Sequence, residues 1–262
     1  MSRLIYNMDN ETYHAQPAIS SSNCKDLLKS TWLYQYKRDN PTSQTPSMAF
    51  GSMVHTLILE PDTFELSYFV ADKPKRNTKE GKAKYEQLEK ECADRLWISV
   101  DEYLKACDMT HNLHQSQASK LILSGGKAEV ATFWQDDTTG TDCRAKCDYI
   151  NADAHYIVDL KTTSSLANES GFKSTVLKYQ YHLSAAMYID GFKKATGKDL
   201  DFYFIVLESA APYNFAFYRL GDDLIASGRG LYRDALAVFE RAKAKDNFKT
   251  PYHDGQLIEL AA

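Results

Sequence analysis

The chain has 262 residues, a formal net charge of −4 at pH 7, 44% hydrophobic residues and five cysteines. This length is enough for one large α/β domain with a substantial core, and no apolar run reaches membrane-spanning length. The cysteines are odd in number without a disulfide-like spacing, and the chain does not begin with a charged and then apolar segment. We therefore expect a soluble cytoplasmic protein with no membrane partner.

Residues 1 to about 124 are predicted to form a mainly helical region. Ser20 to Ser22 are good N-caps for a helix that ends near Lys37 and Arg38. A second helix, residues 50–59, carries His55 four positions after Gly51 and on the same face. Taken alone, a histidine in an apolar helix is more often a hydrogen-bonded core residue than a ligand.

Two further segments complete this region. Residues 73–84 mix lysine and arginine with proline and glycine, which is typical of a phosphate-binding patch or, equally, of a solvated loop. This segment leads into a charged helix at about residues 78–96, and residues 101–124 are predicted to form one more helix.

Three consecutive strands are predicted next. Residues 129–134 form the first, and residues 136–140 form its turn. In residues 141–150 small or apolar side chains alternate with polar ones, and Asp148 stands at the end of the polar face. The short turn at residues 151–153 predicts a hairpin between this strand and the strand at residues 155–163.

The last of these strands carries Asp159 and Lys161. Side chains two apart on a strand share a face, so both point to the side of Ile157, while Val158 and Leu160 point to the other side. Asp148 from the neighbouring strand then converges on the same place. Carboxylates beside an ammonium suit metal-dependent phosphodiester hydrolysis, although an isolated Asp-x-Lys is more often an exposed ion pair at a strand end.

The remaining elements extend the sheet and cover it. A helix around residues 181–188 is followed by strands at residues 200–208 and 214–220 and by a long amphipathic helix at residues 222–243. This order predicts an α/β (α+β) protein with a mixed central β-sheet flanked by helices. The sequence has no Walker loop and no dinucleotide-type glycine pattern, so no nucleotide cofactor is expected.

The order and spacing of these segments resemble the PD-(D/E)xK nuclease superfamily, and within it the RecE-type exonucleases, also called exodeoxyribonuclease VIII. The resemblance rests on residues 19–23, 34–41, 50–61, 143–150, 159–163 and 181–188. It implies a restriction-endonuclease-like fold in a single domain, residues 1–262, with a nuclease core from about residue 125 to 262.

The resemblance also implies a site. His55, Asp148, Asp159 and the backbone carbonyl of Leu160 would bind Mg²⁺ or Mn²⁺, and Lys161 would act as the catalytic base or position the water. Hard divalent cations prefer such carboxylate and carbonyl oxygens. Glu129 is a possible further metal or water ligand, although a solvated carboxylate is equally plausible there.

Two family features are altered or missing. Some relatives hold an iron–sulfur cluster on cysteines near the C-terminus, but no cysteine follows Cys147, so no such cluster is expected. Related nucleases carry Gln-x-x-x-Tyr in the helix after Asp-x-Lys, whereas this chain has Ser184 and Tyr188. Gln180, expected one turn earlier on the same helical face, could supply the missing amide, or Ser184 could act through a water. Simple packing of an amphipathic helix explains most of this stripe equally well.

The function implied by the resemblance is that of a Mg²⁺-dependent exodeoxyribonuclease. It would degrade linear double-stranded DNA from its ends, 5′ to 3′, and leave 3′ single-stranded tails for a partner annealing protein in recombination. Such enzymes are ring-forming homo-oligomers, and a phage or prophage enzyme in a bacterial cytoplasm is expected. The alternatives left open are a structure-specific or single-strand endonuclease of the same fold and a catalytically decayed DNA-binding module.

Contacts to the DNA are less defined by the sequence. A helix N-terminus with a lysine nearby can hold a terminal 5′ phosphate, so Ser22, Lys25 and Arg38 are candidate DNA contacts. Serine caps are also common in helices that bind nothing. The net charge of −4 does not exclude DNA binding, because local basic patches determine the affinity for phosphates.

Overall fold

A six-stranded mixed sheet forms the centre of the computed structural model, which describes residues 2–249 and residue 259. Its strand order is β1-β4-β5-β6-β7-β8. The strands are β1 (Arg3–Ile5), β4 (Lys127–Gln135), β5 (Asp142–Asn151), β6 (Tyr156–Thr163), β7 (Asp201–Glu208) and β8 (Phe215–Arg219). Neighbouring strands are antiparallel except for the parallel pair β6–β7. The predicted fold class is therefore confirmed.

The three strands β4, β5 and β6 form the expected meander. The chain then returns to start β7 parallel to β6, which requires a long crossover. This crossover consists of α9 (Glu169–Lys178) and α10 (Tyr181–Thr196). Helix α9 was not predicted, because its serines, threonine and glycine are weak helix formers. Packing of Phe172 and Val176 into the core stabilises it.

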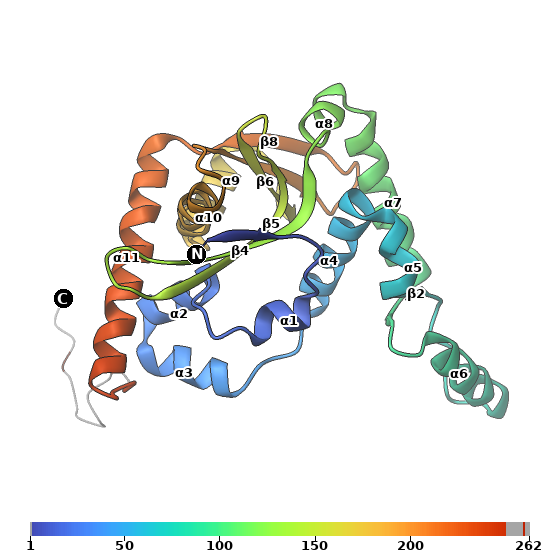
Figure 1. Cartoon of the computed structure of the whole chain (residues 1–262). Coiled ribbons are helices and arrows are strands. Elements are labelled where there is room, and N and C mark those ends of the chain that lie inside the picture. Colours follow the sequence, from blue (N-terminus) through green and yellow to red (C-terminus); the bar gives the residue numbers. More distant parts are fainter. Residues whose placement is uncertain (1, 250–258, 260–262) are drawn as a thin grey trace.

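Helices cover both faces of the sheet. On one face α2 (Ser21–Lys29), α9, α10 and α11 (Asp222–Ala244) share a core with Ile157. On the other face α4 (Pro46–Leu59) and α7 (Val100–Gln115) share a core with Val158 and Leu160. Figure 1 shows α10 and α11 on the opposite side of the sheet from α4 and α7. The alternation predicted for β6 is thus confirmed, and it leaves Asp159 and Lys161 on the α10 side.

The other elements lie mainly before β4. They are α1 (Asn10–Ala15), α3 (Thr31–Asp39), the 3₁₀ turn η1 (Pro61–Thr63), α5 (Phe64–Ser67), α6 (Lys79–Cys92), α8 (Gln117–Ile122) and the parallel pair β2 (Tyr68–Val70) and β3 (Leu96–Ile98). Helix α6 projects away from the central sheet (Figure 1). None of the described helices is long and apolar enough to cross a membrane.

Two helices predicted as continuous are each divided. Ser30 ends α2 and also caps α3, since its side chain accepts a hydrogen bond from the Leu33 amide. Ser116 does the same between α7 and α8 through the Ser119 amide. A serine that serves as a cap competes with helix continuation, which helix periodicity alone does not reveal.

Helix α10 lies very close to both of its neighbours. A Cβ atom on Gly191 would overlap the ring of Trp134 on β4, and one on Gly228 of α11 would overlap the carbonyl oxygen of His182 on α10. These two glycines therefore set the distance of α10 from the sheet and from α11. This matters for function because the N-terminal end of α10 lies beside the Asp159 and Lys161 side chains, as described below.

Replacing Gly228 by alanine is expected to lower the free energy of unfolding by about 1–3 kcal/mol, because backbone atoms of α10 would have to move. The matched control is Gly230→Ala in the same helix, where the new Cβ would meet nothing within 4 Å. That control should stabilise the protein by about 0.5–1 kcal/mol through helix propensity. Urea denaturation of the two variants measures both changes, and equal effects would contradict the close contact.

Candidate metal centre

Two strands and one helix each place an ionisable side chain at one site. His55 of α4, Glu129 of β4 and Asp148 of β5 each offer one ligand atom, and these atoms all lie within 4.8 Å of one another. His55 Nδ1 is 3.5 Å from Asp148 Oδ2. All three side chains are partly accessible to solvent. Two carboxylates and an imidazole at this separation form a suitable ligand set for a divalent cation.

The close approach of α4 to the sheet positions His55. One turn before His55, a Cβ on Gly51 would lie 3.3 Å from Thr162 Oγ1 of β6, so only a small residue allows the helix to lie this near the strand. The glycine four residues before His55 therefore allows α4 to bring the imidazole close to the sheet.

Glu129 reaches the site through an unusual backbone conformation. Its φ of 50° lies in the left-handed region, which costs a non-glycine residue about 1–2 kcal/mol. The ladder between β4 and β5 pairs Ala128 with Tyr149 and Val130 with Cys147, and the interruption falls between them, at Glu129 and Asp148. Strain of this kind often occurs at functional sites. The sequence left Glu129 undecided because nothing in it predicts a left-handed glutamate.

Backbone and lysine contacts hold the two predicted strand carboxylates. The Leu160 amide donates a hydrogen bond to Asp148 Oδ2 at 2.7 Å. Asp159 forms an ion pair with Lys161, whose ammonium also donates to the Leu160 carbonyl at 3.3 Å. The structure therefore brings Asp148, Asp159, Lys161 and the Leu160 carbonyl together as predicted, while Asp159 contacts Lys161 and lies outside the closest three-ligand group.

Two observations show that these residues fit a cation. Asp159 Oδ2 is buried and, apart from its ion pair with Lys161, has no hydrogen-bond partner. Burial and the nearby charge of Asp159 raise the pKa of Asp148 well above its usual range. Carboxylates that repel one another in a partly buried site are stabilised by a divalent cation. Carboxylate oxygens are also the hard ligands that Mg²⁺ and Mn²⁺ prefer.

The electrostatics of the site also define the states of His55 and Lys161. Burial and the positive charge of Lys161 lower the pKa of His55 to about 4, so the imidazole is neutral at pH 7 and able to bind a metal. Burial disfavours the charge on Lys161, but Asp159 and Asp148 outweigh it and raise its pKa above the usual value. A lysine held protonated in this way donates hydrogen bonds and stabilises negative charge.

Lys25 is the candidate phosphate contact that the structure brings nearest to the site. Its Nζ atom lies 5.3 Å from the centre of the Tyr181 ring, and Lys161 Nζ lies 5.1 Å from the same centre. Burial and the charge of Lys161 lower the pKa of Lys25 to about 8. An ammonium placed this way can attract a phosphate toward Lys161.

The other two candidate phosphate contacts lie on the surface of α2 and α3. Ser22 is exposed in the first turn of α2, but the cap of this helix is Ser20, which exchanges hydrogen bonds with Asn23. Arg38 forms an exposed ion pair with Asp39 at 2.9 Å. The roles of Ser22 and Arg38 in DNA binding stay predictions.

One expectation about the helix after Asp-x-Lys is wrong. Gln180 does not continue the helical face of Ser184 and Tyr188, because α10 begins at Tyr181 and Gln180 is its N-cap in a left-handed conformation. Tyr188 packs edge-to-face against Phe202, with ring centres 6.3 Å apart, and burial raises its pKa. Contacts of Gln180, Ser184 or Tyr188 with substrate stay predictions.

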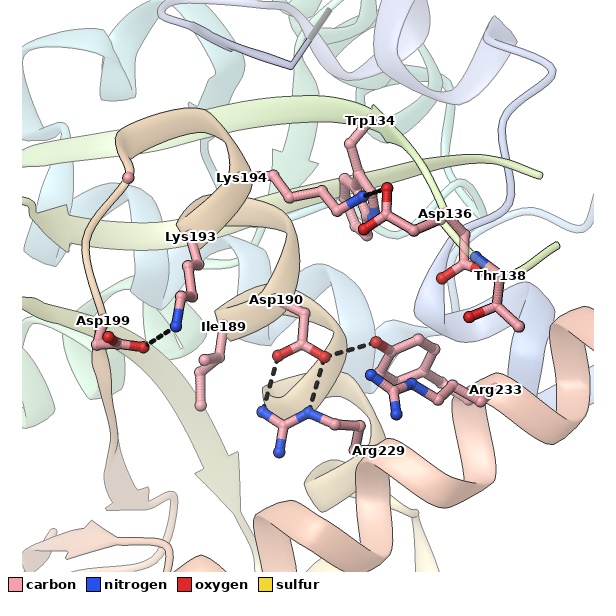
Figure 2. Close-up of a pocket in the computed structure, with 13 residues that line it drawn as sticks. Trp134, Asp136, Thr138, Ile189, Asp190, Lys193, Lys194, Asp199, Arg229 and Arg233 are labelled. Carbon is pink, nitrogen blue, oxygen red and sulfur yellow. Dashed lines mark hydrogen bonds and ion pairs between the residues drawn. The ribbon is translucent and has the colours of Figure 1, made fainter. Parts of the chain in front are cut away.

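A separate pocket of about 720 Å³ lies between the end of β4, α10 and α11, and no predicted site residue lines it. Asp190 accepts two hydrogen bonds from Arg229, at 2.8 and 2.7 Å, and one from the Tyr232 hydroxyl at 2.5 Å (Figure 2). Lys194 is likewise paired with Asp137 at 2.6 Å. These paired charges connect α10 to its neighbours, so the pocket is best explained as part of the scaffold.

The mixed sheet, the Asp159–Lys161 strand and the candidate metal ligands together match the PD-(D/E)xK nuclease class. The chain belongs to the family described as "PDDEXK-like domain of unknown function (DUF3799)", which matches residues 20–255. The predicted superfamily is therefore confirmed, while membership of the RecE type stays a prediction.

A solved structure shows the same fold. A crystal structure described as "Putative exonuclease" from Eubacterium rectale superposes with a TM-score of 0.66 at 14% identity, covering 98% of this chain and 97% of the other. A structure named SSO0001 has a TM-score of 0.31 at 16% identity and covers 60% of this chain and 69% of its own. No functionally curated protein matches the sequence.

Proposed function

We propose that this protein is a Mg²⁺-dependent exodeoxyribonuclease that degrades linear double-stranded DNA from its ends. The observation that carries the proposal is the Asp159–Lys161 ion pair directly beside the group of His55, Glu129 and Asp148. This arrangement combines ligands for a hard cation with a protonated lysine. The description of the Eubacterium rectale structure as a "Putative exonuclease" supports the choice of an end-dependent enzyme.

The residues of the site divide into two roles. His55, Glu129, Asp148, Asp159 and the Leu160 carbonyl would hold the cation. When bound, a divalent cation supplies Lewis-acid stabilisation of the phosphate charge and lowers the pKa of water. Lys161 donates hydrogen bonds that orient the water and stabilise the charge that develops on the phosphate. Because its carboxylate neighbours raise the pKa of Lys161, we favour positioning over proton abstraction.

The biological setting is proposed from the resemblance to the RecE-type exonucleases. Digestion would run 5′ to 3′ and leave 3′ single-stranded tails for an annealing protein in recombination. A ring-forming homo-oligomer in the cytoplasm of a bacterial host, encoded by a phage or prophage, would suit processive digestion.

The test uses linear duplex DNA labelled separately at its 5′ and 3′ ends, together with a closed circular duplex, in the presence of Mg²⁺. Release of nucleotides from the 5′ end of linear DNA only is the expected result. Nicking of the circle would instead indicate an endonuclease of the same fold. Binding without any product, equal with Mg²⁺ and with EDTA, would indicate a decayed DNA-binding module.

A further inference from the structure

Two tyrosines stack on each other at the junction of α9 and α10. The rings of Tyr179 and Tyr181 have centres 5.8 Å apart and planes inclined by 24°. Tyr181 is partly buried and packs against Phe204 of β7, with ring centres 5.9 Å apart. Tyr179 is 50% exposed, so one end of the stack is open to solvent. The pair therefore runs from the surface toward the strand that carries Lys161.

The backbone between the two rings is strained. Gln180 has a φ of 52°, in the left-handed region, and it separates the end of α9 from the start of α10. In a continuous helix, residues two apart do not face each other. The left-handed residue breaks the helix and allows both rings to stack. This conformation is unfavourable for a glutamine, and retained strain of this kind supports a functional hypothesis.

Three ammonium groups accompany the stack. Lys178 Nζ lies 5.3 Å from the centre of the Tyr179 ring, and Lys25 and Lys161 lie at 5.3 and 5.1 Å from the Tyr181 ring. Single-stranded DNA alternates flat bases with negative phosphates, so a site for it combines aromatic faces with cations along the same path. The second exposed stack, Trp32 with Tyr36 on α3, has no such lysines over its rings in the described part of the chain.

We propose that Tyr179 stacks an unpaired base of the strand being cut, in continuation of Tyr181, and so leads its phosphates past Lys25 to Lys161. This inference rests on the proposed function and adds a substrate class to it. The enzyme acts on a nucleotide that has left the duplex, and a frayed end is a better substrate than a fully paired end. Because every base has a flat face, this contact selects for single-strandedness and not for sequence.

The first experiment measures stacking without cleavage. A single-stranded oligonucleotide carries 2-aminopurine near its 5′ end and uncleavable phosphorothioate linkages, and its fluorescence is titrated with protein in Mg²⁺. The native chain should quench the fluorescence. Tyr179→Ala should weaken binding about tenfold and lose the quenching, whereas Tyr179→Phe should retain both. Because Tyr179 is half exposed, the alanine variant should fold, which circular dichroism checks.

The matched control is Tyr36→Ala, which removes an equally exposed tyrosine, 52% accessible, from the other stacked pair. It should bind and quench like the native chain. Equal losses in both variants, or no loss in Tyr179→Ala, would overturn the proposal. Absence of quenching by the native chain would overturn it as well.

A second experiment separates this inference from the proposed function. Linear duplexes with matched or mismatched terminal base pairs are digested by the native chain and by Tyr179→Ala. The native chain should prefer mismatched ends, and the variant should lose that preference. If the native chain digests DNA and the variant shows the same preference, only the stacking site fails. If no DNA is cut but Tyr179-dependent quenching persists, the stacking site stands and the exonuclease proposal fails.

Discussion

Replacing Lys161 by alanine is expected to reduce the rate of DNA cleavage by about a thousandfold or more at saturating Mg²⁺. The ammonium of Lys161 contacts Asp159 and the Leu160 carbonyl, and its carboxylate neighbours keep it protonated. Alanine removes the group that positions water and stabilises the developing charge. The rate of nucleotide release from end-labelled linear duplex measures the effect, and circular dichroism checks that the variant is folded.

The matched control for this prediction is Lys193→Ala. Lys193 is a half-exposed lysine of α10 that pairs with Asp199 at the pocket of Figure 2, away from the predicted site residues. This variant should cleave DNA at the native rate. A Lys161→Ala protein that retains most of its activity would show that the metal ligands suffice and that Lys161 serves only to balance the charge of Asp159.

The sequence predicted the strand residues of the site well because their arrangement depends on local geometry. Alternation along a strand is sufficient to place Asp159 and Lys161 on one face. A short turn is sufficient to place the strand of Asp148 beside the strand of Asp159. His55 depended on the resemblance, since helix α4 alone does not distinguish a ligand from a core histidine. Its place beside the sheet depends on the close approach of Gly51 to Thr162, which is a tertiary feature.

The parts that were missed or left undecided depend on backbone conformations or pairings without a local signal. Glu129 and Gln180 both adopt left-handed conformations that their residue types disfavour, so surrounding packing must impose them. Strand β1 has only three residues and exists through its pairing with β4. In each case tertiary structure overrides local preference. Glu129 belongs to the candidate metal group, and Gln180 lies between the two stacked tyrosines.

Asp148→Asn is expected to reduce the rate of cleavage at least a hundredfold. The same substitution is expected to make the metal-free protein more stable. Asparagine keeps an oxygen that accepts the Leu160 amide hydrogen bond but removes the charge. Burial and the charge of Asp159 raise the pKa of Asp148 in the folded state. The unfolded chain has the ordinary, lower value, so ionisation of Asp148 destabilises the fold.

The sign of the pH dependence follows from this difference. A folded-state pKa above the unfolded value means that the folded protein binds the proton more tightly. Stability contributed by the protonated carboxyl is therefore present below the unfolded pKa and is lost as the pH rises through the folded pKa. Urea denaturation in EDTA should show the advantage of Asp148→Asn growing from acid toward neutral pH. An exposed control, Asp153→Asn, should show no comparable gain.

Addition of Mg²⁺ should reverse the order of stability. A cation that binds only the folded protein stabilises it, and the gain grows with the logarithm of the ratio of the cation concentration to the dissociation constant. The Asp148→Asn variant has lost a ligand, so its stability should increase little. A variant that is instead less stable than the native protein in EDTA would show that the Asp148 carboxylate is a structural hydrogen-bond acceptor. The reversal would tie the destabilising charge of Asp148 to metal binding, because the same carboxylate would be unfavourable without the cation and favourable with it.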